Sequence, residues 1–380
     1  MGEAFIVDAV RTPMGRRGGT LSVVHPQELA ATVLRGLVER NRIDPMELED
    51  VIMGCVTPLG EQGFNIGRMA VLGAGFPVDV PGVQINRMCG SGLQAMNFAA
   101  QGIMAGMLDM AIGGGVESMS RVPMGSDGGN FSTSVTGRYN LVPQGISAEM
   151  IAERWHLTRT ELDEFSLESH RRAAAAQDAG NFDNEIVPVT VPLPDGSTTV
   201  MTRDETIRRD TSLEKMATLK PSFLPDGLVT AGNSSQITDG AAAVLLASER
   251  KMRELGLRPR ARVVTMALVG VDPTIMLTGP IPLTGKILKK AGLHLEDIDV
   301  IEINEAFASV VLAWKKEIQP DMSRVNPNGG AIALGHPLGA TGARLIATLL
   351  NELERRQGRY GLAMLCIGLG MAVGTIIERV

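Results

Sequence analysis

The stretch IDPMELEDVI at residues 43–52 returns, with one gap, as LHLEDIDVI at residues 293–301. Later in each copy, CGSGL at residues 89–93 resembles GATGA at residues 339–343, and each of these opens a helical pattern. The matched positions are 249 residues apart in the first pair and 250 apart in the second. Because both order and spacing repeat, the sequence predicts two similar halves in one chain.

In a third match, DMAIGGG at residues 109–115 resembles the predicted strand and glycine turn at residues 362–370. In the first half, apolar runs of strand length at residues 5–10 and 51–56 alternate with apolar residues at helical spacing within residues 29–38. This alternation is typical of a mostly buried sheet covered by helices. The predicted fold class is therefore α/β.

The region at about residues 121–238 lies between the two halves and has no echo elsewhere in the chain. Ser147 is expected to cap a helix that runs through Trp155, and the capping box at residues 158–161 is expected to begin a longer helix. We therefore predict an inserted domain. The expected domains are the first half at residues 1–120 with 239–258, the insertion at 121–238, and the second half at 259–380.

Composition excludes several classes of protein. Hydrophobic residues make up 44% of the 380 residues and charged residues 21%, as in an ordinary globular protein. Lys and Arg total 36 against 42 Asp and Glu, so the basic excess expected of a nucleic-acid-binding protein is absent. The longest uncharged stretch, residues 361–377, contains four glycines. It is therefore expected to form two strands around a glycine turn and not a membrane span.

Cysteine usage bears on metals and on the compartment. The three cysteines, Cys55, Cys89 and Cys366, are an odd number and show no CxxC or Cys/His spacing, so neither a disulfide framework nor a metal site is expected. A strand-like segment follows within four residues of Met1, without a cationic and then apolar leader. Both features favour the reducing cytoplasm.

Cys89 and His336 are the first candidate reactive residues. Cys89 directly precedes a helical pattern, where free backbone N–H groups and the helix dipole favour a thiolate. His336 lies in the glycine-rich run GHPLGATG, which leaves space around an imidazole. Taken singly, each residue also fits a structural role: a small buried cysteine at a tight helix start, or a histidine satisfied within a turn.

Asn304 and Cys366 are placed at predicted strand ends. Asn304 follows the apolar strand at residues 298–303, where a parallel sheet presents polar groups to a ligand crevice. Cys366 follows the apolar residues 362–365 and precedes glycines whose N–H groups can stabilise an oxyanion. A helix N-cap for Asn304 and a core position for Cys366 are the alternatives.

Four segments together resemble the signatures of one family. NRMCGSGLQA, NEAFA, GHPLGATGAR and CIGLGMAVG, in this order and spacing, look like those of thiolases, which transfer acyl groups to and from coenzyme A (CoA). The resemblance extends over essentially the whole chain. It implies a five-layered α-β-α-β-α fold of two βαβαβ halves with a loop domain inserted in the first. It also implies a homodimer or homotetramer that uses CoA as a substrate and holds no permanent cofactor.

The resemblance assigns a role to each candidate. Cys89 would take the acyl group, His336 would activate it, and Cys366 would move a proton of the acetyl carbon or of CoA. Asn304 would hold a water that forms one oxyanion hole with His336. The backbone N–H groups of Cys89 and Gly368 would form the other. Two further positions, Ser235 and Arg208, match residues that contact CoA.

Two departures from the family pattern concern the acyl group. Leu369 stands where many members have glycine or threonine, and PQG at residues 143–145 replaces the HMG of the short-chain biosynthetic type. The loop resembles the fatty-acid-degrading type, although Gln144 replaces the usual methionine. A buried amide needs a hydrogen-bond partner, which a polar acyl end such as that of 3-oxoadipyl-CoA could supply. The alternative is that Gln144 faces solvent.

The expected function is therefore thiolytic cleavage of 3-oxoacyl-CoA, of the fatty-acid degradation type, with other β-oxidation enzymes as possible partners. A short-chain acetoacetyl-CoA thiolase and a 3-oxoadipyl-CoA thiolase remain alternatives. A cysteine hydrolase could use Cys, His and Asn but has no need of Cys366. A non-catalytic acyl-CoA or lipid carrier would be favoured by loss of Cys89, His336 or Cys366, and all three are present.

Overall fold

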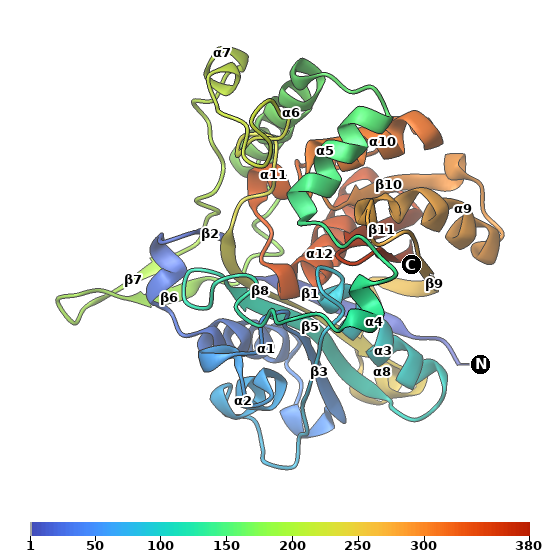
Figure 1. Ribbon diagram of the computed structural model, residues 1–380. Helices are drawn as coiled ribbons and strands as arrows, with labels where there is room; N and C mark the ends of the chain where they lie inside the picture. The colour runs from blue at the N-terminus through green and yellow to red at the C-terminus, as the bar shows by residue number, and fades with distance from the viewer. Residues whose placement is uncertain (1) are drawn as a thin grey trace.

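The computed structural model of the protein describes residues 2–380 and shows two halves that share one continuous sheet (Figure 1). The strands of the first half are β1 (Phe5–Arg11), β2 (Gly15–Arg16), β3 (Asp50–Gly54), β4 (Val83–Ile85), β5 (Met110–Ser118) and β8 (Thr238–Ala247). Those of the second half are β9 (Ala261–Gly270), β10 (Ile298–Ile303), β11 (Tyr360–Ile367) and β12 (Met371–Arg379). The order β4-β3-β5-β8-β1 continues as β9-β12-β11-β10 through a short β1–β9 pairing.

The two halves repeat the same strand pairing. In the first half β3 and β5 are parallel, while β5–β8 and β8–β1 are antiparallel. In the second half β10 and β11 are parallel, while β11–β12 and β12–β9 are antiparallel. A 3-10 turn precedes β3 at Pro45–Glu47, and another precedes β10 at Leu295–Asp297. The predicted repeat is therefore confirmed, and the first echo is this turn with the strand that follows it.

Helices complete five layers, which confirms the predicted fold class. The outer helices of the first half are α1 (Pro26–Asn41) and α2 (Ile66–Gly73), and those of the second half are α9 (Pro280–Ala291) and α10 (Ala308–Ile318). The middle layer consists of α3 (Ser91–Met104) and α12 (Leu338–Arg356), which pack on strands of both halves. The short helix α8 (Glu249–Leu255) connects β8 to β9.

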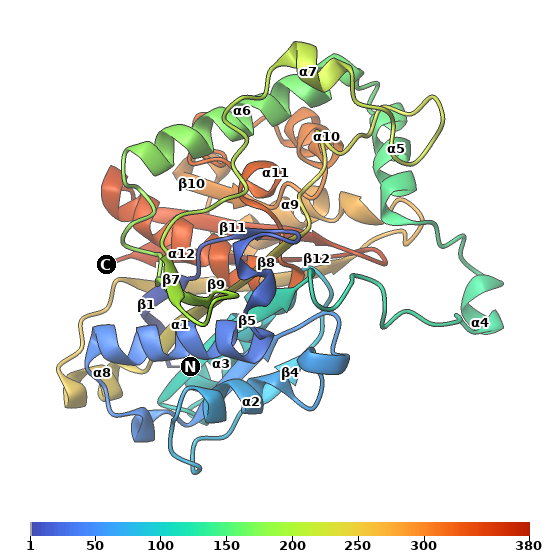
Figure 2. The same cartoon turned by 90° about the vertical axis from the view of Figure 1, so that its left-hand side faces the viewer.

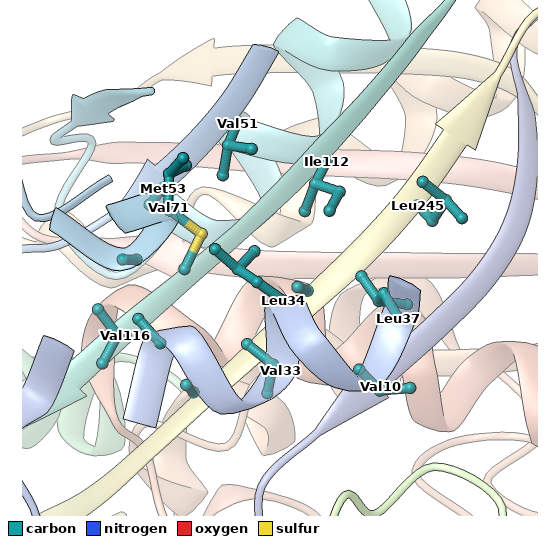
Figure 3. Packing of buried hydrophobic residues seen from close by; sticks show 14 of the residues in the cluster. Val10, Val33, Leu34, Leu37, Val51, Met53, Val71, Ile112, Val116 and Leu245 are labelled. Atoms are coloured by element: carbon teal, nitrogen blue, oxygen red, sulfur yellow. The ribbon is translucent and has the colours of Figure 1, made fainter. Parts of the chain in front are cut away.

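The outer layer of the first half shows why the predicted helical pattern folds as it does. Val33, Leu34 and Leu37 of α1 recur at helical spacing and are fully buried against Ile112 of β5 and Leu245 of β8 (Figure 3). Burying one such side chain contributes about 1.5–3 kcal/mol. The apolar face of α1 therefore fixes this helix on the sheet.

Glycines allow the two middle helices to approach closely. A Cβ on Gly92 of α3 would lie 2.5 Å from the Gly339 carbonyl oxygen of α12. A Cβ on Gly342 of α12 would lie 2.1 Å from the Leu93 nitrogen of α3. The second sequence echo thus marks the helix starts at which the two halves meet. This contact brings the segments that carry Cys89 and His336 together.

The glycines of β5 do not form the turn to which the sequence comparison likened them. Gly113, Gly114 and Gly115 lie inside the strand and are buried. A Cβ on Gly113 would lie 2.4 Å from the Met96 Cα, and one on Gly115 would lie 1.9 Å from the Gly339 carbonyl oxygen. Close packing against α3 and α12 therefore explains this glycine run.

The region between β5 and β8 covers one side of the molecule. Its elements are α4 (Thr133–Thr136), α5 (Gln144–Arg154), α6 (Arg159–Asp178), α7 (Leu213–Ala217), β6 (Val189–Pro192) and β7 (Thr198–Met201). Figure 2 shows α5, α6 and α7 over the top of the molecule and α4 standing away from it. The capping box of Thr158 and Glu161 begins α6 as predicted. The predicted Ser147 cap is wrong, because α5 begins three residues earlier and buries Ser147 inside the helix.

Residues 361–377 form most of β11, the following glycine turn and most of β12, as predicted. Across residues 2–380, no helix combines the length and the apolar character needed to cross a membrane.

Candidate active site

Cys89 lies in a tight turn just ahead of α3 and is 5% exposed. The turn contains Met88 in the left-handed region, with a φ of 47°. The hydroxyl of Ser91 accepts a hydrogen bond from the Arg87 N–H at 2.9 Å and donates to the Met88 carbonyl at 2.6 Å. A Cβ on Gly90 would lie 2.5 Å from Ile367 Cδ1, so the turn packs directly on the end of β11. These contacts hold the Cys89 sulfur at a fixed place.

Three donors influence the Cys89 thiol. Burial raises the pKa of the Cys89 thiol, whereas hydrogen bonds from the backbone N–H groups of Gly368 and Cys89 and from the Gln144 side chain lower it. The resting cysteine is therefore a thiol that needs a base, and the thiolate has donors ready once it forms. The Gln144 side chain is half-buried, and its Nε2 lies 2.8 Å from where a Cβ on Gly368 would be, so the amide is turned toward Gly368.

Cys366 is the penultimate residue of β11 and is fully buried. Burial raises the pKa of its thiol, and the charge of a Cys89 thiolate raises it further. A Cβ on Gly90, the residue after Cys89, would lie 2.5 Å from Ile367, the residue after Cys366, so the two cysteines lie on segments that touch. Cys366 therefore stays protonated while Cys89 ionises, and it is a proton donor beside a nucleophile.

His336 is held by its backbone and by one ring nitrogen. Its N–H group donates to the Gln236 carbonyl at 3.1 Å and to Thr238 Oγ1 at 3.2 Å. Its Nδ1 lies 2.6 Å from Thr341 Oγ1, and that hydroxyl donates its only hydrogen to the Pro337 carbonyl at 2.9 Å. The hydrogen of the neutral imidazole must then be on Nδ1, which leaves Nε2 as the basic nitrogen.

Asn304 faces this basic nitrogen. Asn304 Nδ2 lies 3.3 Å from His336 Nε2 and donates to it in the neutral tautomer. Burial, with a smaller contribution from the Arg344 charge, lowers the pKa of His336 to about 3. The imidazole is thus neutral over the physiological range. Asn304 Oδ1 is buried and has no hydrogen-bond partner within residues 2–380.

Shared contacts join these groups into one site. Leu338, two residues after His336, packs with Cys89 in one apolar cluster. The Asn304 N–H donates to the Met364 carbonyl of β11 at 3.0 Å, and Ala306 packs with Cys366. The structure therefore gathers the five predicted catalytic positions at the ends of the middle helices and of β10 and β11.

The two candidate CoA positions lie beside this site. The Ser235 N–H donates to the Ala306 carbonyl at 2.9 Å, next to the Asn304 segment. A cavity of about 200 Å³ is lined by Arg208, Lys215 and Gln236 among others. The Gln236 carbonyl is the acceptor of the His336 N–H, so the cavity adjoins the catalytic segment. Asp210 also lines the cavity and pairs with Lys215 at 3.0 Å, so Arg208 is the cationic side chain that best suits the phosphates of a nucleotide carrier.

Thr341 and Glu117 form buried hydrogen bonds at the site that the sequence reasoning did not predict. The buried Glu117 carboxylate accepts hydrogen bonds from the N–H groups of Val56, Thr57 and Gly339 and from the Gln62 amide. It thereby ties the start of α12 to the loop after β3. The sequence signal for Glu117 was that it is the single acidic residue of an apolar strand, β5, which is buried throughout.

No group of three His, Cys, Asp or Glu side chains in the described part of the chain forms a metal site.

Comparisons with known proteins give consistent matches. The family models described as the N-terminal and C-terminal domains of thiolase match residues 4–250 and 257–379. A steroid 3-ketoacyl-CoA thiolase of Mycobacterium tuberculosis is 52% identical, over all of this chain and 95% of that protein. A 3-oxoadipyl-CoA/3-oxo-5,6-dehydrosuberyl-CoA thiolase of Escherichia coli is 47% identical over the full length of both. The crystal structure of an acetyl-CoA acetyltransferase of Bacillus anthracis is 42% identical, with a TM-score of 0.93 over all of this chain and 99% of that one.

Proposed function

Because the chain belongs to the thiolase family and is an acyltransferase, we propose that it cleaves a 3-oxoacyl-CoA with CoA through an acyl-Cys89 intermediate. The observation that carries this proposal is the placement of a thiol nucleophile, a protonated second thiol and a neutral histidine at one buried site. A carrier that only binds acyl-CoA needs none of these groups.

In the first half-reaction, Cys89 gives its proton to His336 Nε2, and its sulfur attacks the C3 carbonyl of the substrate. The C2–C3 bond then breaks, and its electron pair passes to C2, which takes a proton from Cys366 to give acetyl-CoA. The N–H groups of Cys89 and Gly368 stabilise the oxygen on C3. His336 with the water held by Asn304 stabilises the thioester oxygen of the departing acetyl-CoA.

In the second half-reaction, CoA gives its thiol proton to the Cys366 thiolate and attacks the acyl-Cys89 carbonyl. The bond between that carbonyl carbon and the Cys89 sulfur breaks, and the sulfur recovers its proton from His336. The products are the shortened acyl-CoA and the resting enzyme. His336 and Cys366 therefore each give one proton and take one proton in a full catalytic cycle.

CoA binding is assigned to the inserted region. We propose that residues 121–238 form a CoA-binding domain, with residues 1–120 and 239–258 as the first catalytic half and residues 259–380 as the second. Ser235 and Arg208 would contact CoA, since both lie along the path between the cavity and the Asn304 segment. The proposal needs no permanently bound cofactor.

The acyl group is proposed to be larger than acetoacetyl, as in fatty-acid degradation. Two relatives carry names that specify a steroid and a 3-oxoadipyl substrate, and both are more similar to this chain than the acetyl-CoA acetyltransferase is. The 3-oxoadipyl substrate is the second candidate, because the name of a full-length relative specifies it.

We also propose a homodimer or homotetramer in the reducing cytoplasm, where the three free thiols stay reduced. Other β-oxidation enzymes are the proposed partners.

The proposal is tested by thiolysis and by trapping the intermediate. The purified enzyme should cleave 3-oxoacyl-CoA with ping-pong kinetics, and mass spectrometry after mixing with acetyl-CoA should find one acetyl group on the peptide that contains Cys89. Cys89→Ala should lose activity, whereas Cys55→Ser changes another buried thiol and should keep it. Full activity of Cys89→Ala would refute the mechanism.

A further inference from the structure

Gln144 is the first residue of α5, and its side chain rests on Gly368. Its Nε2 lies 2.8 Å from the position that a Cβ on Gly368 would occupy. The amide therefore takes the space that a side chain would need at that position. Gly368 is the residue whose N–H faces the Cys89 sulfur, so Gln144 lies directly beside the nucleophile.

The start of α5 is fixed from two sides. A Cβ on Gly145 would lie 2.2 Å from ring carbons of Phe223, and this ring packs edge-on against Phe307 at a centroid distance of 6.0 Å. On the other side, Met276 packs in one apolar cluster with Ala148 of α5. The backbone of α5 at Gln144 is therefore held in place by the packing around it.

The Gln144 amide is available to the reacting atoms. Within residues 2–380 its side chain forms no hydrogen bond to a nitrogen or oxygen atom of the protein. The amide packs against Gly368, close enough to Cys89 that it lowers the pKa of that thiol, as the Gly368 N–H also does. An amide carries two N–H donors, and a donor at sulfur interacts more strongly with a thiolate than with a thiol.

We propose that Gln144 is a further catalytic residue, which donates an N–H to the Cys89 sulfur and stabilises the thiolate formed when His336 takes the proton. This role rests on the proposed function, because it requires Cys89 to be the nucleophile. It also explains why an amide stands here: a methionine of similar length could pack on Gly368 but could not donate.

The test is the pH dependence of Cys89 alkylation by iodoacetamide. The rate should be followed from pH 5 to pH 10 in the native enzyme, in Gln144→Met and in Gln144→Glu, with peptide mapping to identify the labelled cysteine. In Gln144→Met the midpoint should rise by about one pH unit and the rate at pH 7 should fall about tenfold, the scale of one hydrogen bond to a charged group. Gln144→Glu keeps the shape and adds negative charge, so its midpoint should rise further.

The possible outcomes distinguish a failure of the role of Gln144 from a failure of the proposed function. Superposed profiles for the native enzyme and both variants would overturn the role of Gln144, even if the variants lose thermal stability. A purely structural role changes the melting temperature and leaves the midpoint unmoved. If iodoacetamide labels Cys89 of the native enzyme no faster than Cys55, the assignment of Cys89 as nucleophile fails instead.

Discussion

Thr341 determines which nitrogen of His336 is basic. The hydroxyl of Thr341 gives its hydrogen to the Pro337 carbonyl and can therefore only accept at the 2.6 Å contact with His336 Nδ1. Nε2 is thus the nitrogen that can take the proton of Cys89. Pro337 at the N-cap of α12 and Thr341 in its first turn therefore fix the tautomer together.

Replacing Thr341 by valine should keep the shape and remove this acceptor. The buried Nδ1–H would lose its partner, which costs about 1–3 kcal/mol and favours the wrong tautomer. Thiolytic kcat should fall about ten- to a hundredfold with little change in KM. Thr341→Ser is the matched control and should stay within a fewfold of the native rate. Equal activity of the two variants would contradict the tautomer assignment.

His336 should make stability fall in acid. The pKa of His336 is about 3 in the folded protein, against about 6.5 in an unfolded chain. Below pH 6.5 the unfolded chain binds a proton that the folded protein does not, so the free energy of unfolding falls as the pH falls towards 3. Urea unfolding at pH 7 and pH 5 should show a loss about 2 kcal/mol larger in the native enzyme than in His336→Gln. Equal losses would show that His336 is not buried in its neutral form.

Several residues show which parts of the fold and of the site can be predicted from the sequence. The repeated segments predicted the two halves. Cys89, His336, Asn304 and Cys366 could each be predicted as site residues because they lie at the ends of predicted helices and strands. Thr341 could not be assigned, because its contact with His336 depends on the path of a proline turn. In the same way, only the packing of α3 against β5 reveals why Gly113 lies within a strand. The missed roles depend on which atoms tertiary packing brings together, and spacing along the chain does not encode that.

The glycine contact between the middle helices should be intolerant of a methyl group. Gly342→Ala would place a Cβ 2.1 Å from the Leu93 nitrogen, which forces the two helices apart. The free energy of unfolding should fall by about 1–3 kcal/mol, the usual range for overpacking, and activity should fall because Cys89 and His336 shift. Gly285→Ala is the control. Its Cβ meets nothing within 4 Å on the exposed face of α9, so it should stabilise the helix by about 0.5–1 kcal/mol. Calorimetric unfolding that fails to separate the two variants would contradict the packing argument.

Cys366→Ser should separate the two kinds of chemistry at the site. Acylation of Cys89 by acetyl-CoA needs a thiolate and an oxyanion hole, whereas cleavage of the carbon–carbon bond also needs a proton at C2. The variant should still be acetylated at Cys89 while thiolysis falls by about a hundredfold or more, the scale of general acid–base catalysis. Mass spectrometry of the mixed enzyme and a thiolysis assay together measure both. A variant that cannot be acetylated would assign Cys366 to the nucleophilic step.

The position of Gln144 also predicts how the enzyme chooses among acyl groups. If its amide had contacted a polar acyl end, Gln144→Met would change the order of preference and disfavour 3-oxoadipyl-CoA. The amide instead lies on Gly368 at the Cys89 sulfur, where every substrate presents the same C3 carbonyl. We therefore expect Gln144→Met to lower kcat/KM by about tenfold for acetoacetyl-, 3-oxohexanoyl-, 3-oxodecanoyl- and 3-oxoadipyl-CoA alike, since one charge-assisted hydrogen bond is lost for each.

The native enzyme supplies the reference order in the same assay, and acetoacetyl-CoA should be its poorest substrate. A clear preference for acetoacetyl-CoA would defeat the proposal of a larger acyl group. A selective loss with 3-oxoadipyl-CoA in Gln144→Met would instead place the amide at the distal end of the acyl chain. Leu369→Gly is an informative companion, because the Leu369 side chain is 37% exposed on the turn after Gly368 and its φ of 63° favours glycine. A change in the order of preference in Leu369→Gly alone would assign acyl-chain selectivity to the Leu369 side chain. Gln144 would then act only on the Cys89 thiolate.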